Sequence, residues 1–66
     1  MDKEIKTEIL QVLEEVGMAI SPVTLTAIVM KRLELTNDKA IRGVMADLID
    51  KGVLKLTGDR KVRLIS

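Results

Sequence analysis

The sequence predicts a mainly helical α+β fold in which three helices are followed by a small β-hairpin. Two observations predict it. Apolar residues recur at helical spacing in three successive segments, and after Gly52 they alternate with polar residues, as in a strand with one buried face. A chain of 66 residues supports one domain, so residues 1–66 are expected to form a single unit around one small core.

The first helix is predicted over residues 2–16. Its apolar stripe consists of Ile5, Ile9, Val12, Leu13 and Val16. Gly17 then suits the left-handed conformation that ends many helices. Leu10 lies roughly 100° from Ile9 around the helix axis, so it is expected to contact either a flank of the fold or a second subunit. Residues 18–20 form a short apolar run that could add a third strand to the hairpin.

The second helix is predicted to begin at Ser21-Pro22. The serine hydroxyl can cap free backbone N–H groups, and the fixed φ of proline fits the first helical position. Apolar residues then recur every four positions, at Leu25, Val29 and Leu33. The helix therefore buries one side and is predicted to end at residue 33 or 34. Met30 points away from this stripe and is, like Leu10, a candidate for contact with a partner.

The third helix is predicted over residues 37–51, with Thr36 or Asn37 as its N-cap and Asp38 in its first turn. Its buried side consists of Ile41, Met45, Leu48 and Ile49. Helical rotation then turns outward Lys39, Arg42, Gly43, Ala46, Asp47 and Asp50. A glycine inside a helix costs about 1 kcal/mol relative to alanine. Gly43 therefore leaves two interpretations open: simple tolerance, or close approach of another molecule to its backbone.

The hairpin is predicted over residues 53–65. Its apolar face consists of Leu54, Leu56, Val62 and Leu64, with Lys55 and Arg63 on the solvent face. This face requires Leu56 opposite Val62 and a three-residue connection at 58–60. A two-residue turn at Gly58-Asp59 would pair Leu56 with Lys61 and break the apolar face, so the longer connection is favoured.

Composition excludes several classes of protein. The chain has no cysteine and no histidine, so it lacks disulfides, thiolate zinc sites, the commonest metal ligand and the usual general base. We expect no enzyme activity, no catalytic or metal site, no cofactor and no small-molecule ligand. Without Phe, Tyr or Trp, the chain lacks the stacking platforms that hold single-stranded nucleic acids, which favours a duplex as a nucleic-acid partner.

No apolar stretch approaches the roughly 20 residues that a membrane span needs, and the acidic start does not resemble a signal peptide. A cytoplasmic protein without a membrane partner is therefore expected. The net charge of +1 hides an asymmetry. Residues 1–36 carry four basic and six acidic side chains, a charge of −2, whereas residues 37–66 carry seven and four, a charge of +3. Lys31 and Arg32, in the last turn of the second helix, are expected to complement its dipole.

Taken together, these elements resemble the winged helix-turn-helix family over nearly the whole chain. The residues that carry the resemblance are Ser21, Pro22, Leu25, Val29, Leu35, Thr36, Ile41, Met45, Leu48, Gly52, Val53 and Leu54. The resemblance implies a double-stranded DNA-binding protein, in the role of a transcriptional regulator. Helix 37–51 would enter the major groove, and the wing at 53–65 would contact the adjacent backbone or the minor groove. Asp47 and Asp50 depart from this pattern, because acids on that helix would face phosphates.

The expected DNA contacts fall into two groups. On the helix they are Asn37, Lys39, Arg42 and Gly43, and on the wing they are Arg60, Lys61 and Arg63. Arg42 could fork onto a guanine, whereas the wing cations suit phosphates. Asn37 has a competing role as a helix cap. The two groups are expected to lie side by side as one cationic saddle.

The alternative is a winged-helix protein-interaction module or a subunit of a larger assembly. In that hypothesis Leu10, Met30 and the mixed charges of the third helix dock another polypeptide. The same two apolar residues would serve a homodimer, which is a further expectation because one module of this size covers little DNA.

Overall fold

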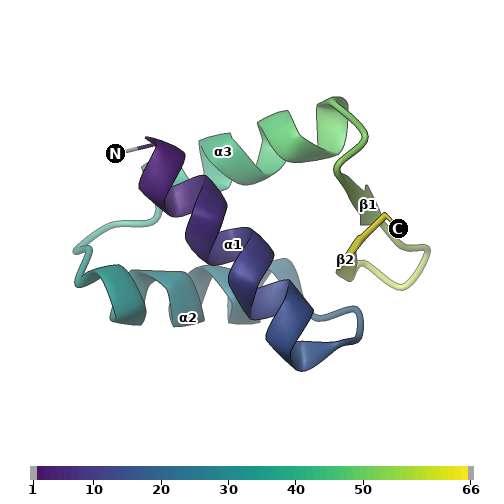
Figure 1. The fold of residues 1–66 in the computed structure, drawn as a ribbon, viewed down its shortest axis with the longest axis horizontal. Helices are drawn as coiled ribbons and strands as arrows, with labels where there is room; N and C mark the ends of the chain where they lie inside the picture. The colour runs from purple at the N-terminus through teal and green to yellow at the C-terminus, as the bar shows by residue number, and fades with distance from the viewer. Residues whose placement is uncertain (1, 66) are drawn as a thin grey trace.

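The structure, a computed structural model, describes residues 2–65 as three helices and a two-stranded antiparallel sheet (Figure 1). The helices are α1 (Asp2–Val16), α2 (Pro22–Leu33) and α3 (Lys39–Asp50), and the strands are β1 (Leu54–Leu56) and β2 (Val62–Leu64). In Figure 1, α1 crosses in front of α2 and α3, and the hairpin follows the end of α3. The predicted mainly helical α+β fold is confirmed, with a layout like that of a winged helix.

The first two helices have the predicted bounds and the predicted ends. Gly17 adopts the left-handed conformation, with φ 69°, and its N–H donates to the Leu13 carbonyl over 3.0 Å. The Ser21 hydroxyl accepts from the Val23 N–H over 3.2 Å and so caps α2. At the other end of α2, Glu34 takes a left-handed conformation, with φ 55°, that glycine adopts at less cost.

The third helix is shorter than the predicted 37–51. Its N-cap is Asp38, not Thr36 or Asn37, and the Asp38 side chain makes no capping hydrogen bond. The Asn37 side-chain oxygen instead accepts from the Lys39 N–H over 3.1 Å. This local turn gives the Lys39 N–H, the first of the helix, a side-chain partner. The backbone at 37 and 38 can therefore form a turn instead of a further helical turn. At the other end Lys51 is the C-cap, and Gly52 follows in the left-handed conformation.

The hairpin has the predicted register, with Leu56 opposite Val62 and Lys55 opposite Arg63. Its strands are shorter than the predicted 53–65, because regular pairing covers only three residues on each side. The expected third strand is reduced to one bridge, in which Ile20 and Val62 exchange both backbone hydrogen bonds at 3.0 and 2.8 Å. Leu56 shares the apolar face but is 52% exposed, since the end of β1 extends past the core.

One core joins all five elements. Its buried hydrophobic residues are Ile5, Ile9, Val12, Leu13, Leu25, Val29, Ile41, Met45, Leu48, Leu54 and Val62. They include the predicted stripes of the three helices, except that Val16 is exposed and that Leu33 and Ile49 are only half-buried. None of the helices described is both long enough and apolar enough to cross a bilayer.

A salt bridge that the sequence did not predict ties α2 to α1. The Arg32 guanidinium donates to Glu8 over 3.0 Å and to Glu15 over 2.7 Å. The hydrogen bond from Arg32 holds the pKa of Glu15 below its ordinary value, and the same pair raises the pKa of Arg32. Arg32 therefore joins two helices, in addition to any interaction with the dipole of its own helix.

Candidate nucleic-acid interface

The outward side of α3 is open to solvent, as predicted. Lys39, Arg42 and Gly43 are all exposed, and the Arg42 side chain retains 73% of its free accessibility. A Cβ built at Gly43 would meet no other atom within 4 Å, so this part of the helix offers a surface that a neighbouring molecule could approach closely. We call these three residues the α3 strip. Asn37, just before the helix, is exposed too, but its side-chain oxygen is engaged in capping Lys39.

The hairpin turn presents the second group of cations in a defined shape. Thr57 organises the turn: its N–H donates to the Lys61 carbonyl over 2.7 Å, and its carbonyl accepts from the Arg60 N–H over 3.1 Å. The Thr57 hydroxyl accepts from the Lys61 N–H over 3.0 Å and donates to the Asp59 carboxylate. The bond from Thr57, aided by the nearby Lys61 charge, lowers the pKa of Asp59. Arg60 occupies a left-handed position, with φ 62°, and Arg60, Lys61 and Arg63 are all exposed.

Ion pairs within α3 and the hairpin are local and solvent-exposed. Arg42 lies 3.9 Å from Asp38, Lys51 lies 3.0 Å from Asp47, and Lys61 lies 3.8 Å from Asp59. Exposed pairs of this kind contribute at most about 1 kcal/mol, so a phosphate could displace the acid at little cost. Within residues 2–65, Lys39, Lys55 and Arg60 form no ion pair.

The surface between the α3 strip and the hairpin differs from the expected cationic saddle. A shallow groove of about 640 Å³ runs from Arg42 to Leu56, and we call it the α2–α3 groove. Its lining consists of Pro22, Val23, Thr26, Ala27 and Met30 of α2, Asp38, Arg42, Met45, Ala46 and Ile49 near or on α3, and Leu56 of β1. Val23 is 78% exposed there. A mostly apolar strip therefore lies between Arg42 and Leu56, and Arg63 lines a different hollow, beside Leu13 and Glu14 of α1.

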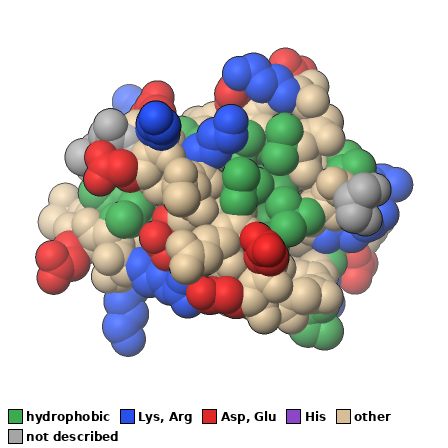
Figure 2. Space-filling model, in the orientation of Figure 1, with side chains coloured by type: hydrophobic (Ala, Val, Ile, Leu, Met, Phe, Trp, Pro, Cys, Tyr) green, Lys and Arg blue, Asp and Glu red, His purple; other side chains and the backbone are tan. Residues whose placement is uncertain are grey.

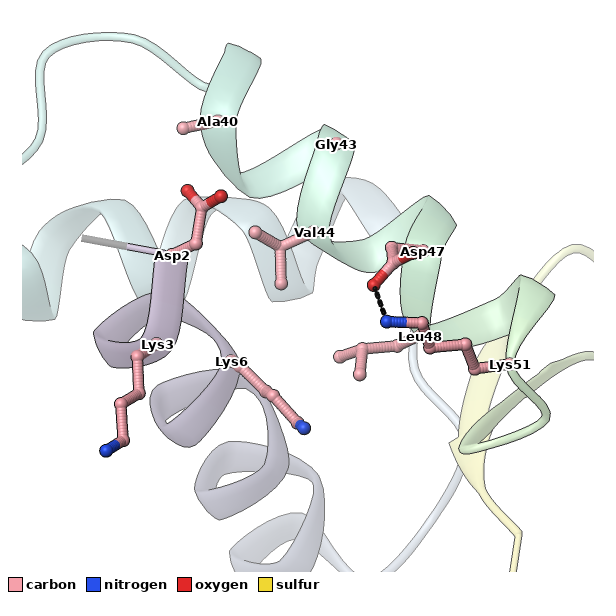
Figure 3. A pocket seen from close by; sticks show the side chains of 9 residues that line it. All are labelled: Asp2, Lys3, Lys6, Ala40, Gly43, Val44, Asp47, Leu48 and Lys51. Carbon is pink, nitrogen blue, oxygen red and sulfur yellow. Dashed lines mark ion pairs between the residues drawn. The ribbon is translucent and has the colours of Figure 1, made fainter.

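The face that bears α1 has a different character. Figure 2 shows basic and acidic side chains interspersed over this face, with hydrophobic side chains gathered towards its hairpin side. A hollow of about 620 Å³ lies between the start of α1 and α3 (Figure 3). Lys3 and Lys6 extend from α1 at its rim, whereas Lys51 reaches back to Asp47 on α3. Gly43 of the α3 strip also lines this hollow, and because acids and bases are mixed here, the hollow does not favour a polyanion.

The two expected partner contacts are less accessible than predicted. Leu10 and Met30 are both half-buried and pack against the core, because each lies on the shoulder of its helix rather than on the outward side. Met30 also lines the α2–α3 groove, whereas Leu10 does not. Among residues 2–65, the large hydrophobic side chains that are exposed are Val16, Met18, Val23, Leu56 and Ile65.

Among residues 2–65, no three carboxylate-bearing side chains lie close enough together to hold a metal ion. Comparisons of the chain with protein-family models, with curated proteins and with solved structures find no match. The assignment of a function therefore depends on the geometry of the α3 strip, the hairpin cations and the groove between them.

Proposed function

We propose that this chain is a small double-stranded DNA-binding protein that acts as a transcriptional regulator. We also propose that it is cytoplasmic. In this proposal α3 enters the major groove, and residues 53–65 contact the adjacent backbone or the minor groove. The observation that carries the proposal is the open α3 strip. Side chains that read base edges must reach them unobstructed, and nothing within residues 2–65 covers Lys39, Arg42 or Gly43.

In this proposal α3 and the hairpin would make different kinds of contact with DNA. Residues 39–50 carry two basic and two acidic side chains, so α3 is neutral and adds little to general attraction. Residues 53–65 carry four basic side chains and one acid, a charge of +3. The hairpin would therefore supply the affinity for phosphates. Arg42 would donate two hydrogen bonds to one guanine and so contribute sequence preference.

Few cations are available, so the expected affinity is modest and its dependence on salt is limited. If the four hairpin cations each neutralise one phosphate, the logarithm of the binding constant should fall with the logarithm of salt concentration with a slope of roughly −3 to −4. A much steeper slope would require cations outside the hairpin.

An NMR titration with a mixed-sequence duplex at two salt concentrations tests the proposal. The largest shifts are expected at Lys39, Arg42, Gly43 and the turn around Arg60, and they should weaken as salt is added. Arg42→Ala and Arg60→Ala should each reduce affinity, whereas Lys6→Ala, on α1, should not. Absence of any shift at low salt, or shifts confined to α1, would refute DNA binding through α3.

A second candidate function is protein docking, and the α2–α3 groove favours it. Apolar surface of this kind is the usual centre of a protein–protein contact and gains nothing from phosphates. In that case Val23→Asp would abolish capture of a protein partner, while Arg60→Ala, which lies outside the groove lining, would leave it largely intact. The DNA proposal expects the opposite result for duplex binding. The loss of a hairpin cation should weaken it and Val23→Asp should leave it largely unchanged, since the hairpin and the α3 strip would carry that contact.

A further inference from the structure

One side of α1 carries charges that no residue in the described range 2–65 pairs with. Lys3, Thr7, Leu10 and Glu14 are spaced by four, three and four residues, so they form a single stripe along the helix. Lys3, Thr7 and Glu14 are exposed and Leu10 is half-buried. The acids that bind Arg32, Glu8 and Glu15, lie on another side of the helix.

Each charged residue of this stripe lies at the helix end whose partial charge has the same sign as its own. The start of a helix is partially positive and its end partially negative, so a cation at position 3 and an anion at position 14 are each repelled. Neither has an ion-pair partner within residues 2–65. The neighbouring Glu15 has the same problem and is relieved by Arg32. Arg63 lines a hollow beside Glu14, but its guanidinium donates to the Leu64 carbonyl.

We propose that this stripe pairs with the same stripe of a second copy of the chain, antiparallel about a twofold axis. Positions 3 and 14 share their midpoint with positions 7 and 10. The register that places Thr7 against Leu10 of the second copy therefore also places Lys3 against Glu14 of the second copy. Each charge then meets an opposite charge and also the opposite end of a helix.

The centre of the stripe is compatible with such a contact. The Thr7 hydroxyl donates to the Lys3 carbonyl over 2.9 Å, so its hydrogen-bonding need is met within the helix and its methyl group can face a neighbour. Together with Leu10 it makes a small apolar centre, which implies a weak, concentration-dependent dimer. No residue of α1 lines the α2–α3 groove, so the pairing leaves Arg42 and Val23 uncovered. The inference does not depend on the proposed DNA binding.

Charge reversal tests the register directly. Lys3→Glu and Glu14→Lys each turn two attractive contacts of the dimer into two repulsive ones, which should weaken self-association roughly tenfold. An equimolar mixture of the two variants should regain it, because in the mixed dimer both contacts join opposite charges. Asp50→Lys makes the same change in charge as Glu14→Lys, but on the outward side of α3, and should have no effect.

Sedimentation velocity over a range of concentrations measures the association, and thermal unfolding of each variant serves as the control. Both reversals put a favourable charge at a helix end, so unfolding temperatures should hold or rise while association is lost. Faster sedimentation of the mixture than of either variant alone supports the pairing. A wild-type chain that stays monomeric at millimolar concentration overturns it, and so does a dimer insensitive to both reversals.

Discussion

The two halves of this protein use their charges differently. Between α1 and α2, Arg32 spans two helices and binds Glu8 and Glu15, so its charge helps to hold the fold together. In α3 and the hairpin, each ion pair stays within four residues of sequence and is exposed. The charged side chains of the second half therefore lie on the surface and do not join one helix or strand to another.

This difference gives the charge asymmetry of the sequence a structural meaning. The first 36 residues carry −2 and the remainder carries +3. Cations that are not needed to join helices can be replaced without loss of stability, and they are free to meet an external anion. Stability and binding should therefore be separable in the second half, whereas in the first half stability should depend on charge.

The largest expected effect separates two adjacent residues of α3. Ile41 is fully buried, so Ile41→Ala should cost about 2–5 kcal/mol of unfolding free energy. Its neighbour Arg42 is exposed, and Arg42→Ala should change stability by no more than about 0.5 kcal/mol. Urea unfolding measures both. A large loss for Arg42→Ala would mean that its charge supports the fold.

Gly43→Ala distinguishes the two interpretations of this glycine. The added methyl group meets no atom within 4 Å apart from its chain neighbours and the backbone of its own helix, so removing glycine from the helix interior should raise stability by about 1 kcal/mol. If DNA approaches the helix backbone at Gly43, duplex affinity should fall in the same variant. Fluorescence anisotropy with a labelled duplex measures this, and unchanged affinity would identify Gly43 as merely tolerated.

At the hairpin tip, two substitutions of Arg60 remove the same charge with different effects on the backbone. Arg60 has a positive φ, so Arg60→Gly should relieve strain and stabilise the protein by up to about 1 kcal/mol. Arg60→Ala keeps the strained conformation and should leave stability nearly unchanged. Both should weaken duplex binding equally. Unequal losses of affinity would show that the shape of the turn matters as well as its charge.

The smallest expected effect concerns the α1–α2 side. Because the folded pKa of Glu15 lies below its unfolded value, the bridge to Arg32 stabilises the protein at neutral pH. That contribution is lost as pH falls below the ordinary pKa of a glutamate and through the lowered folded pKa. Arg32→Met should lower the unfolding temperature slightly at pH 7. In this variant the unfolding temperature should also fall less as the solution is acidified. Duplex affinity should not change, and a loss of it would contradict the division between the two halves.

Elements that depend on local periodicity could be predicted from the sequence. The bounds of α1 and α2 and the pairing of Leu56 with Val62 follow from spacing along the chain. The start of α3 was misplaced because the Asn37 side-chain oxygen accepts from the Lys39 N–H in a local turn before the helix, and residue types alone do not distinguish such a turn from a helix cap. The exposure of Leu56 was missed because alternation identifies a face but not how far the core beneath it extends.

Features that arise only when helices pack could not be predicted. Arg32 and Glu8 are 24 residues apart, and nothing in the sequence distinguishes Arg32 from Lys31, which makes no such bridge in the described chain. The α2–α3 groove likewise forms where Ala27 and Ala46, two small residues on different helices, line one surface. The outward α3 strip was predictable because the buried stripe of an amphipathic helix defines its opposite side.

The bridge between Ile20 and Val62 has a consequence for motion. It fastens β2 to the residue just before the Ser21 cap of α2, while Gly52 connects the other strand to α3. The hairpin is thus anchored at two points and should swing little relative to either helix. Slow exchange of the Ile20 and Val62 amide protons with solvent deuterium would report this stiffness, and a target would then meet Arg42 and Arg60 at a preset separation.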